Sequence, residues 1–96
     1  MGVAKLLHTY RPQILALAQC HGAYNIRVFG SMARGDDSPT SDVDLLVNFE
    51  HSRSLWDHVA LIQDLEGLLG RSVDVVSESA IHWFIRDRVL KEAVSL

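Results

Sequence analysis

The pattern of apolar and polar residues changes its period several times along the chain, which predicts helices alternating with short strands. Apolar residues with helical spacing follow Pro12, which suits the first turn of a helix, and Gly22 suits its end. An apolar run at residues 26–29 predicts a first strand. Ser31 can then cap a brief helical segment over residues 32–34.

The second half of the chain continues this alternation. After a polar loop, residues 43–49 predict a second strand, residues 54–69 an amphipathic helix, and residues 73–76 a third strand. The intervening helix is long enough for a right-handed crossover, so we expect the second and third strands to be parallel. A last helix is expected from Ser79 onward. Its predicted buried stripe consists of Ile81, Phe84, Ile85, Val89, Leu90 and Ala93.

The order α-β-(short α)-β-α-β-α predicts an α/β domain with a short mixed sheet of about three strands flanked by helices. At 96 residues, the chain has room for one core, so we expect residues 1–96 to be a single domain. A net charge of −3 provides no basic field for direct nucleic-acid binding. The lone Cys20, the lack of a signal peptide and the lack of a long apolar run predict a cytoplasmic protein that does not enter membranes.

Three aspartates lie in otherwise apolar predicted strands: Asp42 and Asp44 at the second strand, and Asp74 inside the third. Side chains alternate along a strand, so Asp42 and Asp44 point to the same face. A solvated face is the ordinary explanation for such a pair, but residues 45–47 are apolar without interruption, as in a strand covered on both faces. If the two strands are neighbours, three carboxylates converge. Such a cluster usually has a shared proton or bound cations.

Magnesium is the cation that suits this cluster, because it prefers oxygen ligands and keeps open positions for phosphate oxygens. Two Mg²⁺ ions on three aspartates are typical of phosphoryl or nucleotidyl transfer. Ten residues separate Ser31 from Asp42, and Gly30 and Ser31 open the short predicted helix. Backbone N–H groups at such a start can bind an anion, with the Ser31 hydroxyl as a further donor. The sequence therefore predicts a site for magnesium and a nucleoside triphosphate.

The string FGSMARGDDSPTSDVDLLV, followed by LLGRSVDVV and a last helix ending in LKEAV, resembles the minimal nucleotidyltransferases (MNT proteins) of the DNA polymerase β-like superfamily. The likeness covers nearly the whole chain. By position, it implies that Asp42, Asp44 and Asp74 are catalytic magnesium ligands, with Asp74 as candidate general base. It also implies that Gly30 and Ser31 hold the triphosphate of ATP.

Arg34 lies in the same segment, close to where phosphates would bind. Two interpretations stay open: it contacts the nucleotide, or it pairs with Asp36, Asp37 or a carboxylate of the centre. Asp36 and Asp37 themselves are interpreted as part of a solvated loop.

The resemblance implies a function as well. MNT proteins are the antitoxins of HEPN/MNT toxin–antitoxin pairs. The expected protein is a Mg²⁺-dependent, type VII-like antitoxin that transfers AMP from ATP to a tyrosine of its HEPN ribonuclease toxin, with which it forms a hetero-oligomer. All five motif positions match the family pattern, so loss of activity is not indicated.

Two alternatives remain. The protein could neutralise its toxin by binding alone, or it could modify a small molecule such as an antibiotic. Enzymes of the latter kind add a second domain that builds the acceptor pocket, which the length of this chain disfavours. Trp56 and Trp83 lie near helix starts, where core packing is the default and a partner interface is the alternative.

Overall fold

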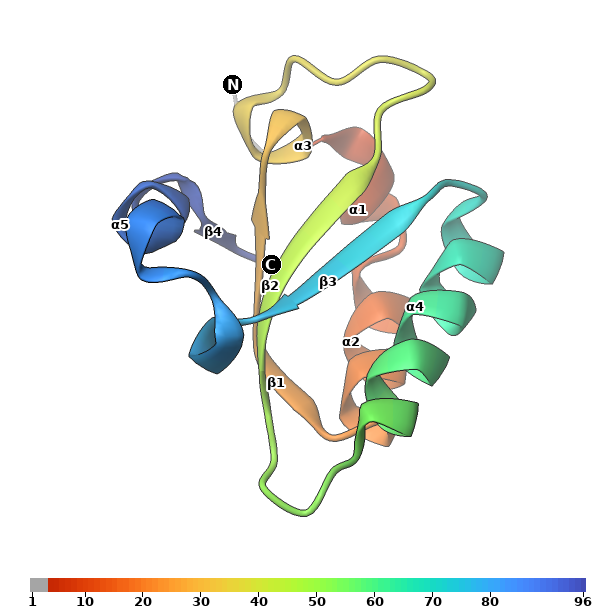
Figure 1. Ribbon diagram of the computed structural model, residues 1–96. Coiled ribbons are helices and arrows are strands. Elements are labelled where there is room, and N and C mark those ends of the chain that lie inside the picture. Colours follow the sequence, from red (N-terminus) through yellow and green to blue (C-terminus); the bar gives the residue numbers. More distant parts are fainter. Residues whose placement is uncertain (1–3) are drawn as a thin grey trace.

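A four-stranded mixed sheet runs through the molecule, with helices on both of its faces (Figure 1). The computed structural model describes residues 4–96. Its elements are α1 (Lys5–Thr9), α2 (Arg11–Cys20), β1 (Ala23–Phe29), α3 (Ser31–Arg34), β2 (Val43–Phe49), α4 (Leu55–Leu69), β3 (Val73–Ser77), the 3₁₀ helix η1 (Glu78–Ala80), α5 (Trp83–Glu92) and β4 (Val94–Ser95). No helix in this part of the chain is both long and apolar enough to cross a membrane.

The strand order is β3-β2-β1-β4. Strand β1 is antiparallel to β2 and to β4, whereas β2 and β3 are parallel and connected through α4. The predicted mixed α/β fold and the crossover are thus confirmed. The sheet also contains β4, which has only two residues and is too short to leave a pattern in the sequence.

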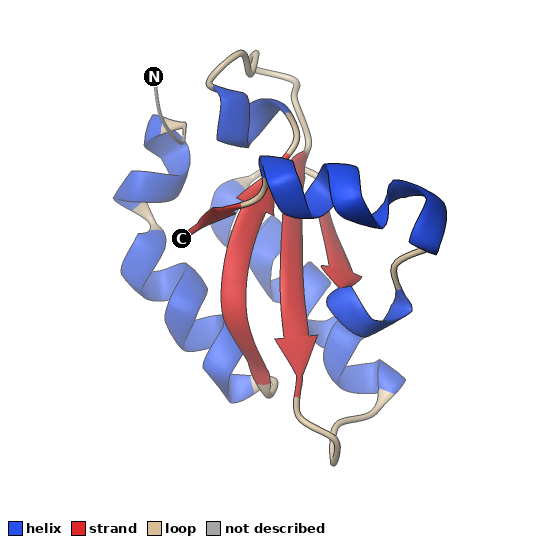
Figure 2. Cartoon of the chain, turned by 90° about the vertical axis from the view of Figure 1, so that its left-hand side faces the viewer, coloured by secondary structure: helices blue, strands red, loops and turns tan. Residues whose placement is uncertain are grey.

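The two faces of the sheet have different coverings. Val28, Leu45 and Val75 alternate onto one face and belong to the buried core, which α1, α2 and α4 cover. Asp44 and Asp74 point to the other face. Figure 2 shows α5 crossing in front of the strands on that second face. Asp44 and Asp74 therefore lie on the face that the last helix crosses rather than in the main core.

The last helix differs from its prediction. It begins at Trp83 rather than near Ser79, because Glu78–Ala80 form a 3₁₀ turn and the His82 side chain caps the helix by accepting a hydrogen bond from the Phe84 N–H. The expected buried stripe is wrong, since no residue of α5 is buried. Helical spacing shows that a face is apolar, but it does not show whether another element covers it.

Helix α4 follows its prediction closely. Ser54 caps it through the Trp56 N–H and forms a capping box with Asp57, and Gly70 ends it in a left-handed conformation. The helix buries Leu61, Leu65 and Leu69 against the core. The default interpretation of the two tryptophans as core residues is wrong, because Trp56 is 80% and Trp83 is 77% exposed.

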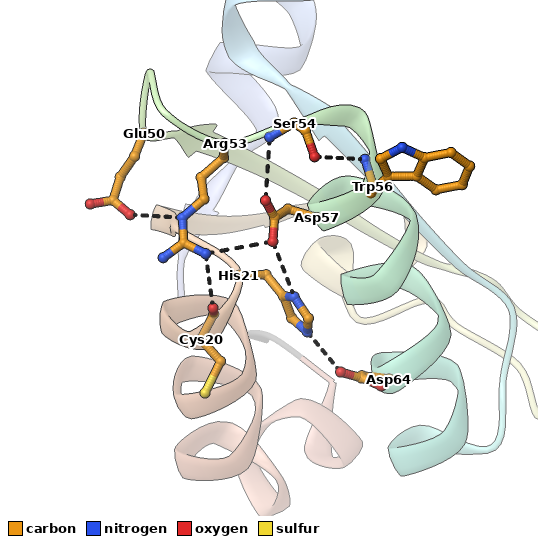
Figure 3. Close-up of polar contacts among 8 residues, drawn as sticks. All are labelled: Cys20, His21, Glu50, Arg53, Ser54, Trp56, Asp57 and Asp64. Carbon is orange, nitrogen blue, oxygen red and sulfur yellow. Dashed lines mark hydrogen bonds and ion pairs between the residues drawn. The ribbon is translucent and has the colours of Figure 1, made fainter.

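Polar contacts join α4 to the end of α2 (Figure 3). The Arg53 guanidinium donates to the Cys20 carbonyl and also contacts Asp57. His21 lies between Asp57 and Asp64, with its Nε2 at 2.8 Å from Asp64 Oδ2. These contacts connect the two helices on the core face of the sheet, at the end of the sheet opposite the aspartates. Cys20 itself is exposed.

Candidate active site

Asp44 and Asp74 are direct neighbours across the parallel strands β2 and β3. Their side chains share one face, and neighbouring strands lie about 4.8 Å apart. Asp44 is half-buried, while Asp74 is exposed. Asp42 immediately precedes β2 and is also exposed. The predicted convergence of carboxylates is thus visible most closely for the pair Asp44 and Asp74.

The pKa of Asp44 is raised above its ordinary value, first because partial burial disfavours the charged form. The negative charges of Asp74, Asp42 and Glu92 raise this pKa further, and the positive charge of Arg34 lowers it. The site therefore holds an excess of negative charge around a half-buried carboxylate. A bound cation would relieve this repulsion.

Gly30 lies against Asp44 at the turn from β1 into α3. Its φ of 75° belongs to the left-handed region, and a Cβ at this position would overlap Asp44 Oδ2. Only glycine therefore allows this close approach of backbone and carboxylate. Gly30, rather than Ser31, is the N-cap residue of α3, and Ser31 is the first helical residue. Gly30 thus lies directly beside Asp44, and Ser31 follows it as the first residue of α3.

Arg34 ends α3 and pairs with two carboxylates. Its Nε lies 3.0 Å from Asp36 Oδ2, and its Nη1 lies 2.8 Å from Glu92 Oε1. Glu92 Oε1 also accepts a hydrogen bond from the Gly30 N–H at 2.5 Å. Arg34 therefore pairs as one of its two interpretations expected, and it keeps its guanidinium at the edge of the site.

Glu92 is the residue of this site that sequence reasoning missed. It is the last residue of α5 and lies 62 positions from Gly30 in the sequence. The only signal was its place in the string LKEAV, which gives no hint of what its side chain contacts. Its position follows from the path of α5 back across the sheet.

The donor set fits magnesium in chemistry, because Asp42, Asp44 and Asp74 offer only oxygen ligands. The repulsion around Asp44 also fits a cation. Within residues 4–96, however, no group of three or more His, Cys, Asp or Glu side chains is arranged to hold a metal ion. The role of the three aspartates as metal ligands stays a prediction.

A hollow of about 450 Å³ opens at the opposite end of the sheet, between Gln19, Tyr24 and Arg53. None of the predicted site residues lines it. It lies near the start of β1, whereas Asp44 pairs with Phe29 at the end of that strand. The concave surface and the acidic chemistry are therefore separate features of the molecule, and the chemistry identifies the candidate active site.

Comparison with known proteins identifies the family of the chain. The family model described as the nucleotidyltransferase domain matches residues 13–96. A solved structure described as a minimal nucleotidyltransferase, a provisional name, is 48% identical, covers all of this chain and 97% of its own, and superposes with a TM-score of 0.87. The fold and the family match define a nucleotidyltransferase. The chain belongs, within that class, to the minimal nucleotidyltransferase family.

Two sequence relatives come from archaea. A protein of Methanocaldococcus jannaschii, provisionally named a protein adenylyltransferase, is 39% identical over 94% of this chain and 97% of its own length. The protein adenylyltransferase MntA of Thermococcus cleftensis is 44% identical over 81% of this chain and 79% of its own. A toxin–antitoxin structure with AMP-PNP, 22% identical with a TM-score of 0.76, covers 88% of this chain and 69% of its own and shares the fold.

Proposed function

We propose that this nucleotidyltransferase is the antitoxin of a HEPN/MNT pair and transfers AMP from ATP to a tyrosine of its HEPN ribonuclease toxin. The observation that carries the proposal is the adjacency of Asp44 and Asp74 on one sheet face, with the Gly30 turn against Asp44. This arrangement combines a place for triphosphate oxygens with carboxylates that can act on an attacking hydroxyl. The names of the archaeal relatives and the toxin–antitoxin structure support the choice of substrate.

In the proposed reaction, the tyrosine hydroxyl oxygen attacks the α-phosphorus of ATP. A new phosphorus–oxygen bond forms, the bond to the pyrophosphate breaks, and the hydroxyl proton passes to the Asp74 carboxylate as general base. The Gly30 N–H, the Ser31 hydroxyl and the Arg34 guanidinium bind the triphosphate oxygens. The products are the AMP-modified tyrosine, pyrophosphate and a proton.

Asp42, Asp44 and Asp74 would hold magnesium, two ions in the proposed complex. When bound, Mg²⁺ would polarise the phosphates and neutralise charge on the departing pyrophosphate. Thermal stability can test magnesium binding without an activity assay, because a bound cation should offset the repulsion around Asp44. Magnesium should therefore raise the melting temperature of the wild-type protein more than that of Asp44→Asn.

The deciding experiment needs the partner, which a neighbouring gene for a small helical protein with an R-x₄-H motif would supply. That toxin is incubated with ATP, Mg²⁺ and the present protein, and its mass is measured. We expect an AMP adduct with wild type and none with Asp44→Ala. Asp37→Asn is the matched control, because it removes a carboxylate from the loop before β2 and should leave the adduct unchanged.

Absence of the adduct with wild type would contradict the proposal. An adduct that persists undiminished with Asp44→Ala would do the same, because the half-buried carboxylate would then have no part in the transfer. A tyrosine-to-phenylalanine series in the toxin identifies the acceptor.

Neutralisation by binding alone is the second candidate, and the exposed apolar side chains of α5 favour it. Trp83 and Phe84 are 77% and 75% exposed and belong to α5, which crosses the face of the sheet that carries the aspartates. If docking suffices, Asp42→Asn/Asp44→Asn still rescues cells that express the toxin, at equal protein levels. If transfer is required, the double variant fails although it binds the toxin.

A further inference from the structure

Glu92 places a negatively charged oxygen on two of the groups that the proposed function assigns to ATP. Its Oε1 accepts from the Gly30 N–H at 2.5 Å and from Arg34 Nη1 at 2.8 Å. We call these two groups the Gly30–Arg34 donor pair. Glu92 is half-buried, with about a quarter of its side chain (27%) exposed. The contact joins the end of α5 to the turn between β1 and α3.

A carboxylate oxygen and a phosphate oxygen compete for such donors, because both are anionic acceptors that bind N–H and guanidinium groups in the same manner. The Gly30 N–H has a single hydrogen to donate. It cannot serve Glu92 and a phosphate oxygen fully at the same time. Glu92 therefore occupies the position that a triphosphate oxygen requires.

We propose that Glu92 is an internal competitor of ATP, and that it must leave the Gly30–Arg34 donor pair before the triphosphate can bind. This inference rests on the proposed function, because it concerns the same nucleotide site. It assigns the last residue of α5 a regulatory role: the free protein is held in a self-blocked state by its own C-terminal segment.

The surroundings of Glu92 favour its departure. Asp44 lies close enough to repel it, and among residues 4–96 its side chain accepts hydrogen bonds from the Gly30–Arg34 donor pair alone. The helix that carries Glu92 buries no residue. The strand that follows pairs with β1 at Arg27 and Val28, and Leu96 beyond it donates to the Ile26 carbonyl and packs against the core. Release of Glu92 therefore requires no buried side chain of α5 to be exposed, while β4 and Leu96 keep the end of the segment on the sheet.

Calorimetric titration with ATP and Mg²⁺ tests the competition. Glu92→Gln removes the charge but keeps the size of the side chain, and we expect it to bind ATP about tenfold more tightly than wild type, the change expected when one charge-assisted contact no longer has to be broken. Asp87→Asn is the matched control, since it removes the same charge from an exposed position on the same helix. It should bind ATP as wild type does. Glu92→Ala provides a second variant, with the same expected direction.

The NMR chemical shift of the Gly30 amide distinguishes competition at this hydrogen bond from a general effect of charge on ATP affinity. In the free proteins it should differ between wild type and Glu92→Gln, because the hydrogen-bond acceptor has changed. With ATP bound the two resonances should coincide, because Glu92 has left. The inference would be overturned if wild type and Glu92→Gln bound ATP equally well, if Glu92→Gln bound it more weakly, or if Asp87→Asn gained as much affinity. A Gly30 amide resonance that still differed between the two proteins in the ATP complex would overturn it too. Each of these results would leave the proposed function intact. If neither protein binds ATP, the proposed function fails and the inference fails with it.

Discussion

Asp44 carries its charge in half-buried surroundings that also contain the carboxylates of Asp42, Asp74 and Glu92. Such an arrangement costs folding free energy, because burial and repulsion both disfavour the ionised side chain. Active sites commonly retain unfavourable groups of this kind, since the function requires them. Residue-scale predictions follow from this conflict between stability and chemistry.

Asp44→Asn should make the protein more stable while it abolishes AMP transfer. The amide keeps the shape of the side chain but removes the repulsion, a gain on the order of 1 kcal/mol, or about 4–8 °C in the melting temperature of a domain this small. Thermal unfolding at neutral pH without divalent cations measures the change. A variant that melts below wild type would show that the charge is stabilised in the folded protein.

Gly30→Ala should destabilise the protein by about 1–3 kcal/mol, because it forces a side chain into left-handed backbone and against Asp44 Oδ2. Gly67→Ala is its matched control. Gly67 lies within α4, where an added Cβ meets no atom within 4 Å, so alanine should stabilise by about 0.5–1 kcal/mol. Denaturant unfolding of the two variants gives both values, and equal signs would contradict the structure.

At the scale of elements, the sequence predicts a helix end well where neighbouring residues form it. The Ser54 cap, the Gly70 stop and the parallel pairing of β2 with β3 all follow from neighbouring residues or from one crossover. The α5 helix shows the limit of such reasoning. Its start depends on a 3₁₀ turn, and its exposure depends on whether another element packs against it. The spacing of apolar residues indicates neither. The contact of Glu92 with Gly30 could not be predicted for the same reason, because it depends on where α5 lies.

Glu78 is an anchor between three elements. From η1 its carboxylate contacts Arg27 of β1 at 2.5 Å and Arg86 of α5 at 3.5 Å. The hydrogen bond from Arg27 lowers the pKa of Glu78 below its ordinary value of 4.5, with smaller contributions from charge attraction to both arginines. A lowered pKa means that the ionised form is the one the folded state favours.

Glu78→Gln should therefore cost about 1 kcal/mol at neutral pH. The stability that Glu78 provides is fully present above the pKa of the unfolded state, near 4.5, and is lost as pH falls through the lower folded-state pKa. The gap between wild type and variant should therefore close in acid. Denaturant unfolding from pH 7 to pH 3 measures it.

Glu50→Gln serves as the control, because Glu50 forms an exposed pair with Arg53 at 3.3 Å. Such pairs contribute roughly 0–1 kcal/mol. A larger loss with Glu50→Gln than with Glu78→Gln would contradict the anchoring role of Glu78.

At the scale of the whole molecule, the most exposed large apolar side chains of residues 4–96 lie at the starts of two helices. Leu55 and Trp56 lie at the start of α4, and Trp83 and Phe84 lie at the start of α5. The two helices cover opposite faces of the sheet (Figure 1). Only the α5 pair lies on the face of the aspartates. A protein substrate that presents a tyrosine to Asp74 must approach from that face.

Trp83→Ala should weaken binding of the proposed toxin partner by about 2 kcal/mol, roughly 30-fold, as expected for an aromatic side chain at the centre of an interface. Trp56→Ala, which removes an equally exposed indole from the other side, should change the affinity little. Titration of each variant with the toxin measures both. A loss confined to Trp56→Ala would place the interface on the α4 side and leave the aspartates facing away from the partner.

Strand β3 forms one edge of the sheet, and an edge offers backbone groups to any other strand. Side chains of α4 occupy these backbone groups, so another strand cannot pair with them. Glu66 Oε2 accepts a hydrogen bond from the Val73 N–H at 3.0 Å, and His58 Nε2 donates to the Val75 carbonyl at 2.6 Å. The charge of Asp74 lies between these two positions on the same strand. The edge that carries the proposed general base is therefore also protected against pairing with another strand and against aggregation. The Asp74 carboxylate would serve both purposes.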